Sequence, residues 1–423
     1  MNKVIQIFKV RELRNKILFV LAVFAIFRLM AAIPIPGINI ENLRAFFDQF
    51  QVFGLLNLFT GGTLSNLSIA MLGLGPYITA VIIMQLLTMI FPALERMYKE
   101  EGEAGQKKFN QYGRILTVPL SILQGYAMLN LFQSQGAIGH LTPTLMVTSI
   151  ITITAGGLLL MWLGELISER GIGDGVSLLI FAGIIARVPA SMRELLISWD
   201  PSKIPTYLLF FAMALLIVAG VVMVNEARRN IPVSYAKRVR GMKMYGGVST
   251  YLPLNVNPAG VIPIIFALSI MLFPGMISNF LAGSAGMVGH IAQVVGELFK
   301  NQWFYGSIYF LLVVLFTYFY TAVTFDPKAI SENLQKMGGF IPGIRPGSST
   351  SNYLYYILNR VLLIGALFLG IVAVLPSIIS GSTGIQGFSF LIGGTALLII
   401  VSVALDSMRK VNAQLQMREY ETF

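Results

Sequence analysis

The chain has 423 residues, of which 56% are hydrophobic and only 12% are charged, and its mean hydropathy is +0.75. Soluble domains carry about 25% charged residues, so this composition excludes a water-soluble globule and favours a multi-pass membrane protein. Lys and Arg outnumber Asp and Glu by 30 to 19, and the chain has no cysteine and 2 histidines, which excludes disulfides and disfavours metal sites built from thiolate or imidazole.

Ten apolar stretches separated by short polar ones predict ten transmembrane helices, because a span requires about 20 apolar residues. The first stretch runs into Ile33-Pro-Ile-Pro-Gly37 rather than a small-residue cleavage site, so we expect a span and not a cleaved signal peptide. The predicted spans are 17–35, 74–92, 115–133, 146–164, 176–190, 205–224, 259–281, 304–324, 354–375 and 388–406.

Three places depart from ordinary spans. Residues 57–72 are moderately apolar but too short and too rich in glycine to cross a bilayer. Gly171, Gly173 and Gly175 predict a tight turn before the short fifth span, and Pro263 and Pro274 are expected to kink the seventh. Interrupted spans in both halves of a chain suggest a central cavity, although ordinary kinks filled by neighbouring helices are an equal alternative.

The distribution of positive charge predicts the orientation. With the N-terminus inside, the inner segments carry 23 of the 30 Lys and Arg residues and the outer loops carry five. Inner loops are enriched in Lys and Arg, so we expect both termini to be cytoplasmic.

Residues for covalent or ion-coupled chemistry are scarce. The chain has no Walker-type phosphate loop, no zinc-protease motif and no cluster of carboxylates within a span, which disfavours an enzyme. Arg28 and Arg360 lie within spans and are expected to pair locally or to snorkel, although lining a water-filled path is the alternative. The spans are instead rich in isoleucine, and a ring of such side chains around a pore makes a constriction that excludes ions without a charged gate.

The inner loops 225–258 and 325–353 are the longest cytoplasmic segments, and the first is strongly basic. Such a loop ordinarily enforces topology or touches anionic lipid. The interleaved Tyr235, Tyr245 and Tyr251 also allow contact with RNA phosphates or with an acidic protein.

Short motifs in these spans and loops resemble the SecY family, the channel subunits of the bacterial protein translocon. Each motif alone is weak, but together they occur in family order over almost the whole chain. They are IPIPG (33–37), GLGPYI (73–78), MWLGE (161–165), ERGIG (169–173), FAGI (181–184), YAKR (235–238), STYLPLNVN (249–257), AGVIP (259–263), NLQK (333–336), FIPGIRPG (340–347) and GGT (393–395).

The resemblance implies an all-α membrane protein whose ten helices form two inverted five-helix halves, 1–200 and 201–423, around a pore. A short half-helix near 57–72 would be the plug, comprising Thr60, Gly61, Gly62, Thr63, Leu64, Ser65, Asn66, Leu67 and Ser68. The implied pore ring is Leu74, Ile78, Ile180, Ile184, Ile265 and Ile399. The seam between spans two and three and spans seven and eight would be the lateral gate, through which signal sequences and transmembrane segments enter the lipid.

The resemblance also implies partners. The two long inner loops would dock the ribosome or the SecA motor ATPase, chiefly through Arg345, with Lys237, Arg238, Arg240 and Lys243. Asn255 stands where many relatives have lysine, which weakens the ribosome contact. The small membrane subunits SecE and SecG are implied as companions, anionic lipids as a further contact, and no cofactor is implied.

The leading hypothesis is therefore a passive protein-conducting channel in the bacterial cytoplasmic membrane. A secondary transporter of a small solute, built from inverted repeats, is the alternative, and it predicts saturable uptake driven by an ion gradient. A membrane-embedded enzyme comes third, because suitable residues are lacking.

Overall fold

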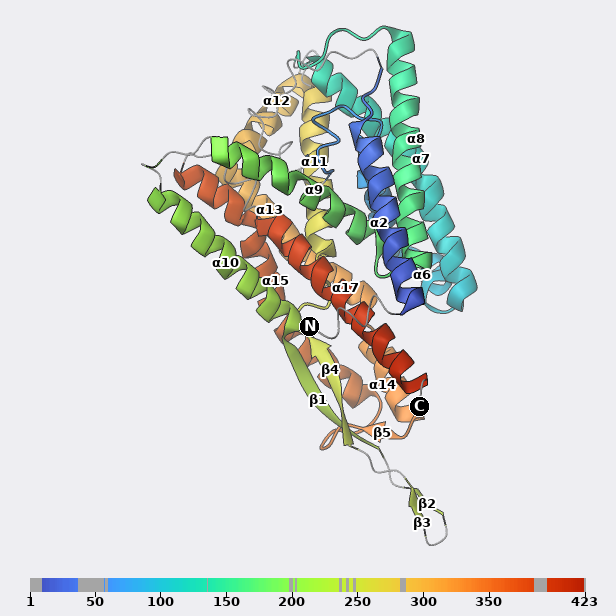
Figure 1. Cartoon of the computed structure of the whole chain (residues 1–423). Helices are drawn as coiled ribbons and strands as arrows, with labels where there is room; N and C mark the ends of the chain where they lie inside the picture. Colours follow the sequence, from blue (N-terminus) through green and yellow to red (C-terminus); the bar gives the residue numbers. More distant parts are fainter. Residues whose placement is uncertain are drawn as a thin grey trace.

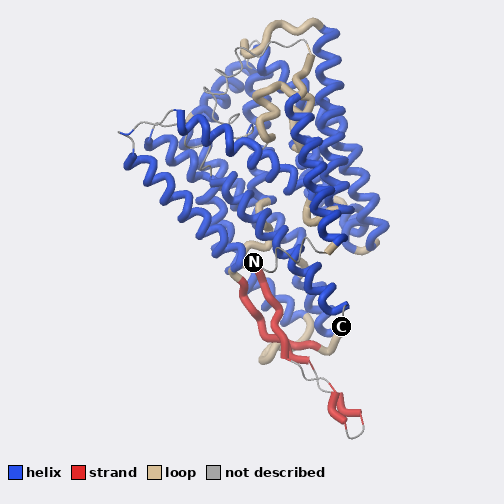
Figure 2. The backbone as a smooth tube through the Cα atoms, viewed as in Figure 1, coloured by secondary structure: helices blue, strands red, loops and turns tan. Residues whose placement is uncertain are grey.

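A computed structural model shows a long bundle of helices with strands beyond one end (Figures 1 and 2). The structure describes residues 10–36, 57, 60–134, 136–197, 201, 204–235, 238–240, 243–245, 249–281, 287–383 and 394–421.

The first half of the chain supplies six of the described helices. Thr142 caps one of them by accepting a hydrogen bond from the Leu145 N–H, and Pro143 begins it because the first turn needs no N–H donor there. These helices are α2 (Arg11–Ala32), α5 (Gly75–Ile90), α6 (Pro92–Lys99), α7 (Gly102–Ser134), α8 (Pro143–Arg170) and α9 (Gly175–Ile197).

The second half supplies seven more. Asn301 and Asp326 cap two of them, each accepting hydrogen bonds from two backbone N–H groups of the first turn. These helices are α10 (Ile204–Glu226), α11 (Ile262–Leu281), α12 (Met287–Lys300), α13 (Gln302–Thr324), α14 (Pro327–Lys336), α15 (Ser348–Thr383) and α17 (Gly394–Glu421).

Each of the ten predicted spans overlaps one of these helices. Six described helices are long and apolar enough to cross a membrane, or seven when α5 and α6, which meet at an angle of 112°, are counted as one broken span. The apolar parts of α9 and α11, Gly175–Ala190 and Ile262–Met271, are shorter. Residues 388–393 of the last predicted span lie outside the described part of the chain.

The helices form two groups with a shared centre. In Figure 1, α2, α6, α7 and α8 lie on one side and α10, α13, α15 and α17 on the other, with α9 and α11 between them. The contacts between elements support this central position of α9 and α11. Helix α9 touches α2, α8 and α17, and α11 touches α5, α7 and α13. Segments from both halves therefore meet at α9 and α11.

The local backbone differs from the expectations in two places. Pro263 does not kink the seventh span, because it is the second residue of α11 and so lies where a helix needs no N–H donor; Pro274 does lie within the helix. Of the half-helix expected near 57–72, Asn57 is helical and residues 58–59 lie outside the described part of the chain, whereas residues 60–74 form consecutive turns with one isolated bridge between Pro34 and Ser68. Gly61, Gly62 and Leu67 have φ values of 70°, 87° and 41° there, and such positive values interrupt a right-handed helix.

The described parts of the two long inner loops contain strands and a helix. Strands β1 (Arg228–Tyr235) and β4 (Ser249–Asn255) pair antiparallel, and β5 (Gly339–Phe340) adds to the other edge of β1. Strands β2 (Arg238–Arg240) and β3 (Lys243–Tyr245) form a separate pair at the far tip (Figure 1). The three-stranded sheet closes over a small core with α14 and α15, formed by Ile231, Val233, Leu254, Leu334, Ile341 and Leu354.

Candidate functional site

An apolar cluster lies where the two groups of helices meet. Five of the six predicted ring residues are buried members of this one cluster, and the sixth, Ile78, packs against it. They come from four segments: Leu74 precedes α5, Ile180 and Ile184 lie on α9, Ile265 lies on α11 and Ile399 lies on α17. The structure therefore brings together all the residues named for the ring.

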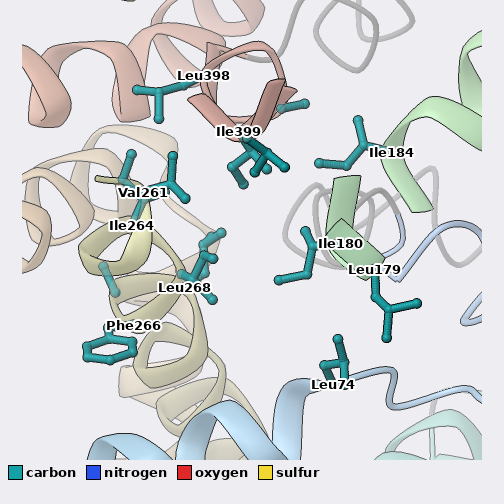
Figure 3. Close-up of a cluster of buried hydrophobic side chains, with 14 of the residues drawn as sticks. Leu74, Leu179, Ile180, Ile184, Val261, Ile264, Phe266, Leu268, Leu398 and Ile399 are labelled. Carbon is teal, nitrogen blue, oxygen red and sulfur yellow. The ribbon is translucent and has the colours of Figure 1, made fainter. Parts of the chain in front are cut away.

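Figure 3 shows how these side chains lie. Leu74, Ile180, Ile184 and Ile399 surround a common centre, and Leu268 of α11 points toward Ile180 from the opposite side. Leu268 is a buried member of the cluster that we did not predict. Leu268 could have been predicted from its position four residues after Ile264 on the same helix, because residues four apart share a helix face.

The side chains of this cluster are hydrocarbon, apart from a few sulfur atoms and tyrosine hydroxyls, and no charged residue belongs to it. Such a lining offers no ligand for an ion or a polar solute. Among the described residues no group of three or more His, Cys, Asp or Glu could hold a metal ion. An apolar constriction of this kind excludes water and ions while it is closed.

Residues 60–74, the turn segment, lie beside this cluster and hold their own shape through internal hydrogen bonds. The Asn57 carbonyl oxygen accepts from the Gly62 N–H at 2.8 Å, and its side-chain oxygen accepts from the Ser65 N–H at 3.0 Å. The hydroxyls of Thr63 and Ser65 donate to the carbonyls of Thr60 and Gly62. All nine residues named for the plug lie in this segment.

The later part of the turn segment is built into the first half of the protein. The Ile35 N–H donates to the Leu67 carbonyl at 2.8 Å and the Ile69 N–H donates to the Ile33 carbonyl at 3.0 Å. A second apolar cluster surrounds this bridge and joins the segment to α7 and α8, through Ile35, Leu64, Leu67, Met71, Leu72, Met128, Leu129, Phe132 and Ile153. Residues 63–72 are thus part of a folded core.

The two charged residues predicted within spans both have partners. Arg28 of α2 donates from Nη1 to the Gly61 carbonyl oxygen at 2.9 Å. The Arg360 guanidinium lies over the Tyr356 ring, 4.3 Å from its centroid, one turn away on α15. Arg360 therefore has a partner on its own helix, whereas the partner of Arg28 lies 33 residues further along the chain.

The residues named for docking fall in two places. Arg345 is exposed in the turn between β5 and α15, where its carbonyl accepts from the Thr350 hydroxyl at 2.9 Å. Arg238 and Arg240 lie on β2 and Lys243 on β3, whereas Lys237 lies outside the described residues. The structure therefore separates Arg345, beside the three-stranded sheet, from the basic residues of the β2–β3 tip (Figure 1).

Polar contacts at the strand-bearing end tie α17 to α10. Arg409 bonds the Glu226 carboxylate, with its shortest contact at 2.6 Å, and the Asn225 carbonyl at 2.9 Å. Asn225 in turn donates to the Ser402 hydroxyl at 2.6 Å and accepts from Asn257 at 2.9 Å. These contacts fix α17 to α10 and to the start of α11, and sequence reasoning did not find them because the partners lie far apart in the chain.

Fold and site together define a multi-pass helical membrane protein with an apolar centre between two groups of helices and a turn segment beside it. The SecY family profile matches residues 68–408. The chain is 43% identical to the protein translocase subunit SecY of Mycobacterium bovis over 97% of each chain, and 43% identical to that of Corynebacterium glutamicum over 100% of this chain and 99% of the relative. This chain belongs to the SecY family.

Solved structures with the same fold agree. One described as a protein-conducting channel matches 93% of this chain and 91% of its own with a TM-score of 0.64 at 19% identity. A canine Sec61 in a ribosome–channel complex from the endoplasmic reticulum matches the same shares with a TM-score of 0.61 at 19% identity. At these identities the likeness establishes the fold.

Proposed function

We propose that this chain is the passive protein-conducting subunit of a translocase, which moves unfolded preproteins across the bacterial cytoplasmic membrane and releases transmembrane segments sideways into lipid. The observation that carries the proposal is the apolar cluster at which both halves of a SecY-family chain converge. Leu74, Ile78, Ile180, Ile184, Ile265 and Ile399 are its pore ring, and Leu268 is added to them.

The chemistry of the cluster suits this substrate. An unfolded polypeptide presents every kind of side chain in turn, so a channel for it needs a compliant apolar seal rather than a selective polar site. Isoleucine and leucine side chains close around the passenger, and they exclude water when the pore is empty. No step of this process makes or breaks a covalent bond, so the chain is a channel and not an enzyme.

The lateral exit lies between the two groups of helices, where α11 contacts α5 and α7. An apolar passenger segment is more stable in lipid than in an aqueous pore, so it leaves through this seam, whereas a polar segment continues across. The halves 1–200 and 201–423 move apart as the two sides of the pore.

The strand-bearing end is the docking surface for the ribosome and for the SecA motor. The titles of structural neighbours describe ribosome-bound Sec61 and Ssh1 complexes, which supports the ribosome as a partner. Arg345 is exposed in the turn between β5 and α15 and presents a positive charge there. SecE and SecG are the small membrane subunits that accompany the chain, and anionic lipids contact its basic inner segments.

Both termini are cytoplasmic in this proposal. The sequence places 23 of its 30 Lys and Arg residues in segments on that side. The strands, α14 and the C-terminal end of α17 lie at one end of the molecule (Figure 1), as expected if these segments share one side of the membrane.

Reconstitution tests the proposal. Proteoliposomes containing the chain with its small subunits should protect an added preprotein from protease when the motor and ATP are supplied. The same vesicles should show no saturable solute uptake driven by an ion gradient. Solute uptake without preprotein protection would instead support the secondary transporter.

A further inference from the structure

The tip of the turn segment, residues 60–62, meets α2 and α9. A Cβ atom built on Gly61 would lie 2.6 Å from the Gly183 Cα of α9, so the two backbones are in direct contact and Gly61 has no room for a side chain. Gly61 also has a φ of 70°, which favours glycine. The tip therefore sits on α9 at the residue next to Ile184 of the apolar cluster.

The tip also forms a hydrogen bond with a charged side chain, Arg28 of α2. The Arg28 guanidinium of α2 donates to the Gly61 carbonyl at 2.9 Å. Arg28 lies four residues before the end of α2, within an otherwise apolar span. A cation within a span is costly unless it finds polar partners, and the Gly61 carbonyl is such a partner. A hydrogen bond from a charged donor is about twice as strong as a neutral one.

The tip and the base of the turn segment are held differently. The base is fixed by the hydrogen bonds between residues 33–35 and 67–69 and by the second apolar cluster. The tip meets α9 at the Gly61 backbone, which contributes little apolar area, and at Gly62, beside which the Arg187 side chain of α9 lies; it meets α2 through the hydrogen bond from Arg28. Loss of the Arg28 bond therefore removes this hydrogen bond to α2 and loosens the tip, while the base keeps its own contacts.

We infer that Arg28 is a latch that holds the tip of the turn segment on Gly183, so that the apolar cluster beside Ile184 stays covered while no passenger is present. Arg28 is a positioning residue, and the inference rests on the proposed channel function. A passenger that enters the apolar cluster displaces the tip from Gly183, which breaks the bond from Arg28 to the Gly61 carbonyl and opens the outer side of the pore.

The absence of native cysteine makes the tip easy to monitor. Thr60→Cys places a single thiol on the half-buried residue before Gly61. In proteoliposomes holding the assembled channel, Arg28→Ala should raise both the rate of maleimide modification at this thiol and the resting ion conductance. Removing a hydrogen bond to a charged group should raise each by about tenfold to hundredfold.

Arg360→Ala is the matched control, because it also removes an arginine from a span, one whose contact is the Tyr356 ring and not the tip. It should leave both readouts at the original level. Arg28→Lys keeps a donor of similar reach and should preserve most of the seal. Arg28→Gln has too short a side chain and should behave like Arg28→Ala.

Folded Arg28→Ala and Arg28→Gln channels with both readouts equal to those of Arg360→Ala would overturn the latch. If Arg28→Ala does not fold, the two readouts of Arg28→Gln are compared with those of Arg28→Lys. Equal values for these two variants would likewise contradict the role of Arg28. A stalled preprotein cross-linked to residue 78 in the same vesicles tests the channel separately. The proposed role of Arg28 can therefore be disproved in a protein that still translocates preproteins.

Discussion

At the scale of single residues, glycine decides how closely segments approach. A Cβ built on Gly156 of α8 would overlap the Ile69 carbonyl oxygen, so the turn segment lies directly against the helix backbone. Gly113 of α7, in contrast, has no heavy atom within 4 Å of the same built position. Gly156 is therefore needed for close packing, whereas Gly113 is not.

Substituting Gly156 and Gly113 by alanine gives a prediction about stability. Gly156→Ala should lower the free energy of unfolding by about 1–3 kcal/mol, because overpacking displaces the turn segment. Gly113→Ala should raise it by up to about 1 kcal/mol through helix propensity. Thermal unfolding of both variants in detergent measures the difference, and equal shifts for the two would contradict the close contact.

Charge at one exposed position carries a second prediction. Arg345→Glu should abolish motor-driven export while the protein still inserts and accumulates, because the exposed side chain has no role in the core. Lys107→Glu reverses an exposed charge on α7, away from the sheet, and should export normally. Export is measured by protease protection of a preprotein. Normal export by Arg345→Glu would remove this residue from the docking surface.

At the scale of elements, sequence reasoning located the spans but missed the strands. Span positions follow from long apolar runs, which lie close to the observed helices. In β1, Ile231 and Val233 alternate with exposed residues, which is the two-residue period of a strand. Neighbouring charges and Pro232 obscured this pattern. Pro232 is tolerated in the middle strand because β5 pairs only with Ser234 and Tyr235.

The turn segment could not be predicted in detail for a different reason. Its glycine content signalled an irregular backbone, but the hydrogen bonds of Asn57 and the contact with Gly183 depend on residues far apart in sequence. Local propensity contains no information about such partners. The resemblance implied a half-helix near 57–72. Residues 60–74 instead form turns, and the positive φ values among them are incompatible with a right-handed helix.

The small core beneath the sheet yields an element-scale prediction. Ile231→Ala removes a side chain that is 2% exposed and should destabilise this sheet by about 2–5 kcal/mol. Limited proteolysis should then cut the strand-bearing end faster while the helices stay protected. Tyr251→Ala on the partner strand, where the side chain is 66% exposed, is the control and should resist proteolysis like the original protein. Equal cutting of both variants would argue against the core.

At the scale of the whole molecule, the proposed orientation rests on the distribution of charge and leads to a prediction. A reporter enzyme active only outside the cytoplasm should be inactive when fused after Phe423 and active when inserted after Gly139, which lies between α7 and α8. The reason is the excess of Lys and Arg on the inner side. Activity of the fusion at Phe423 would contradict the cytoplasmic C-terminus.

The central claim is that a polypeptide passes through the apolar cluster. Ile78→Cys places the only thiol of the chain against that cluster, and Leu216→Cys places it on α10, where the side chain is 70% exposed on the outside of the bundle. A secretory chain stalled in the membrane, with one cysteine of its own, is then oxidised with each variant. The account predicts a disulfide adduct at residue 78 and none at residue 216. An engaged chain that forms no adduct at residue 78, or forms it equally at residue 216, would contradict it.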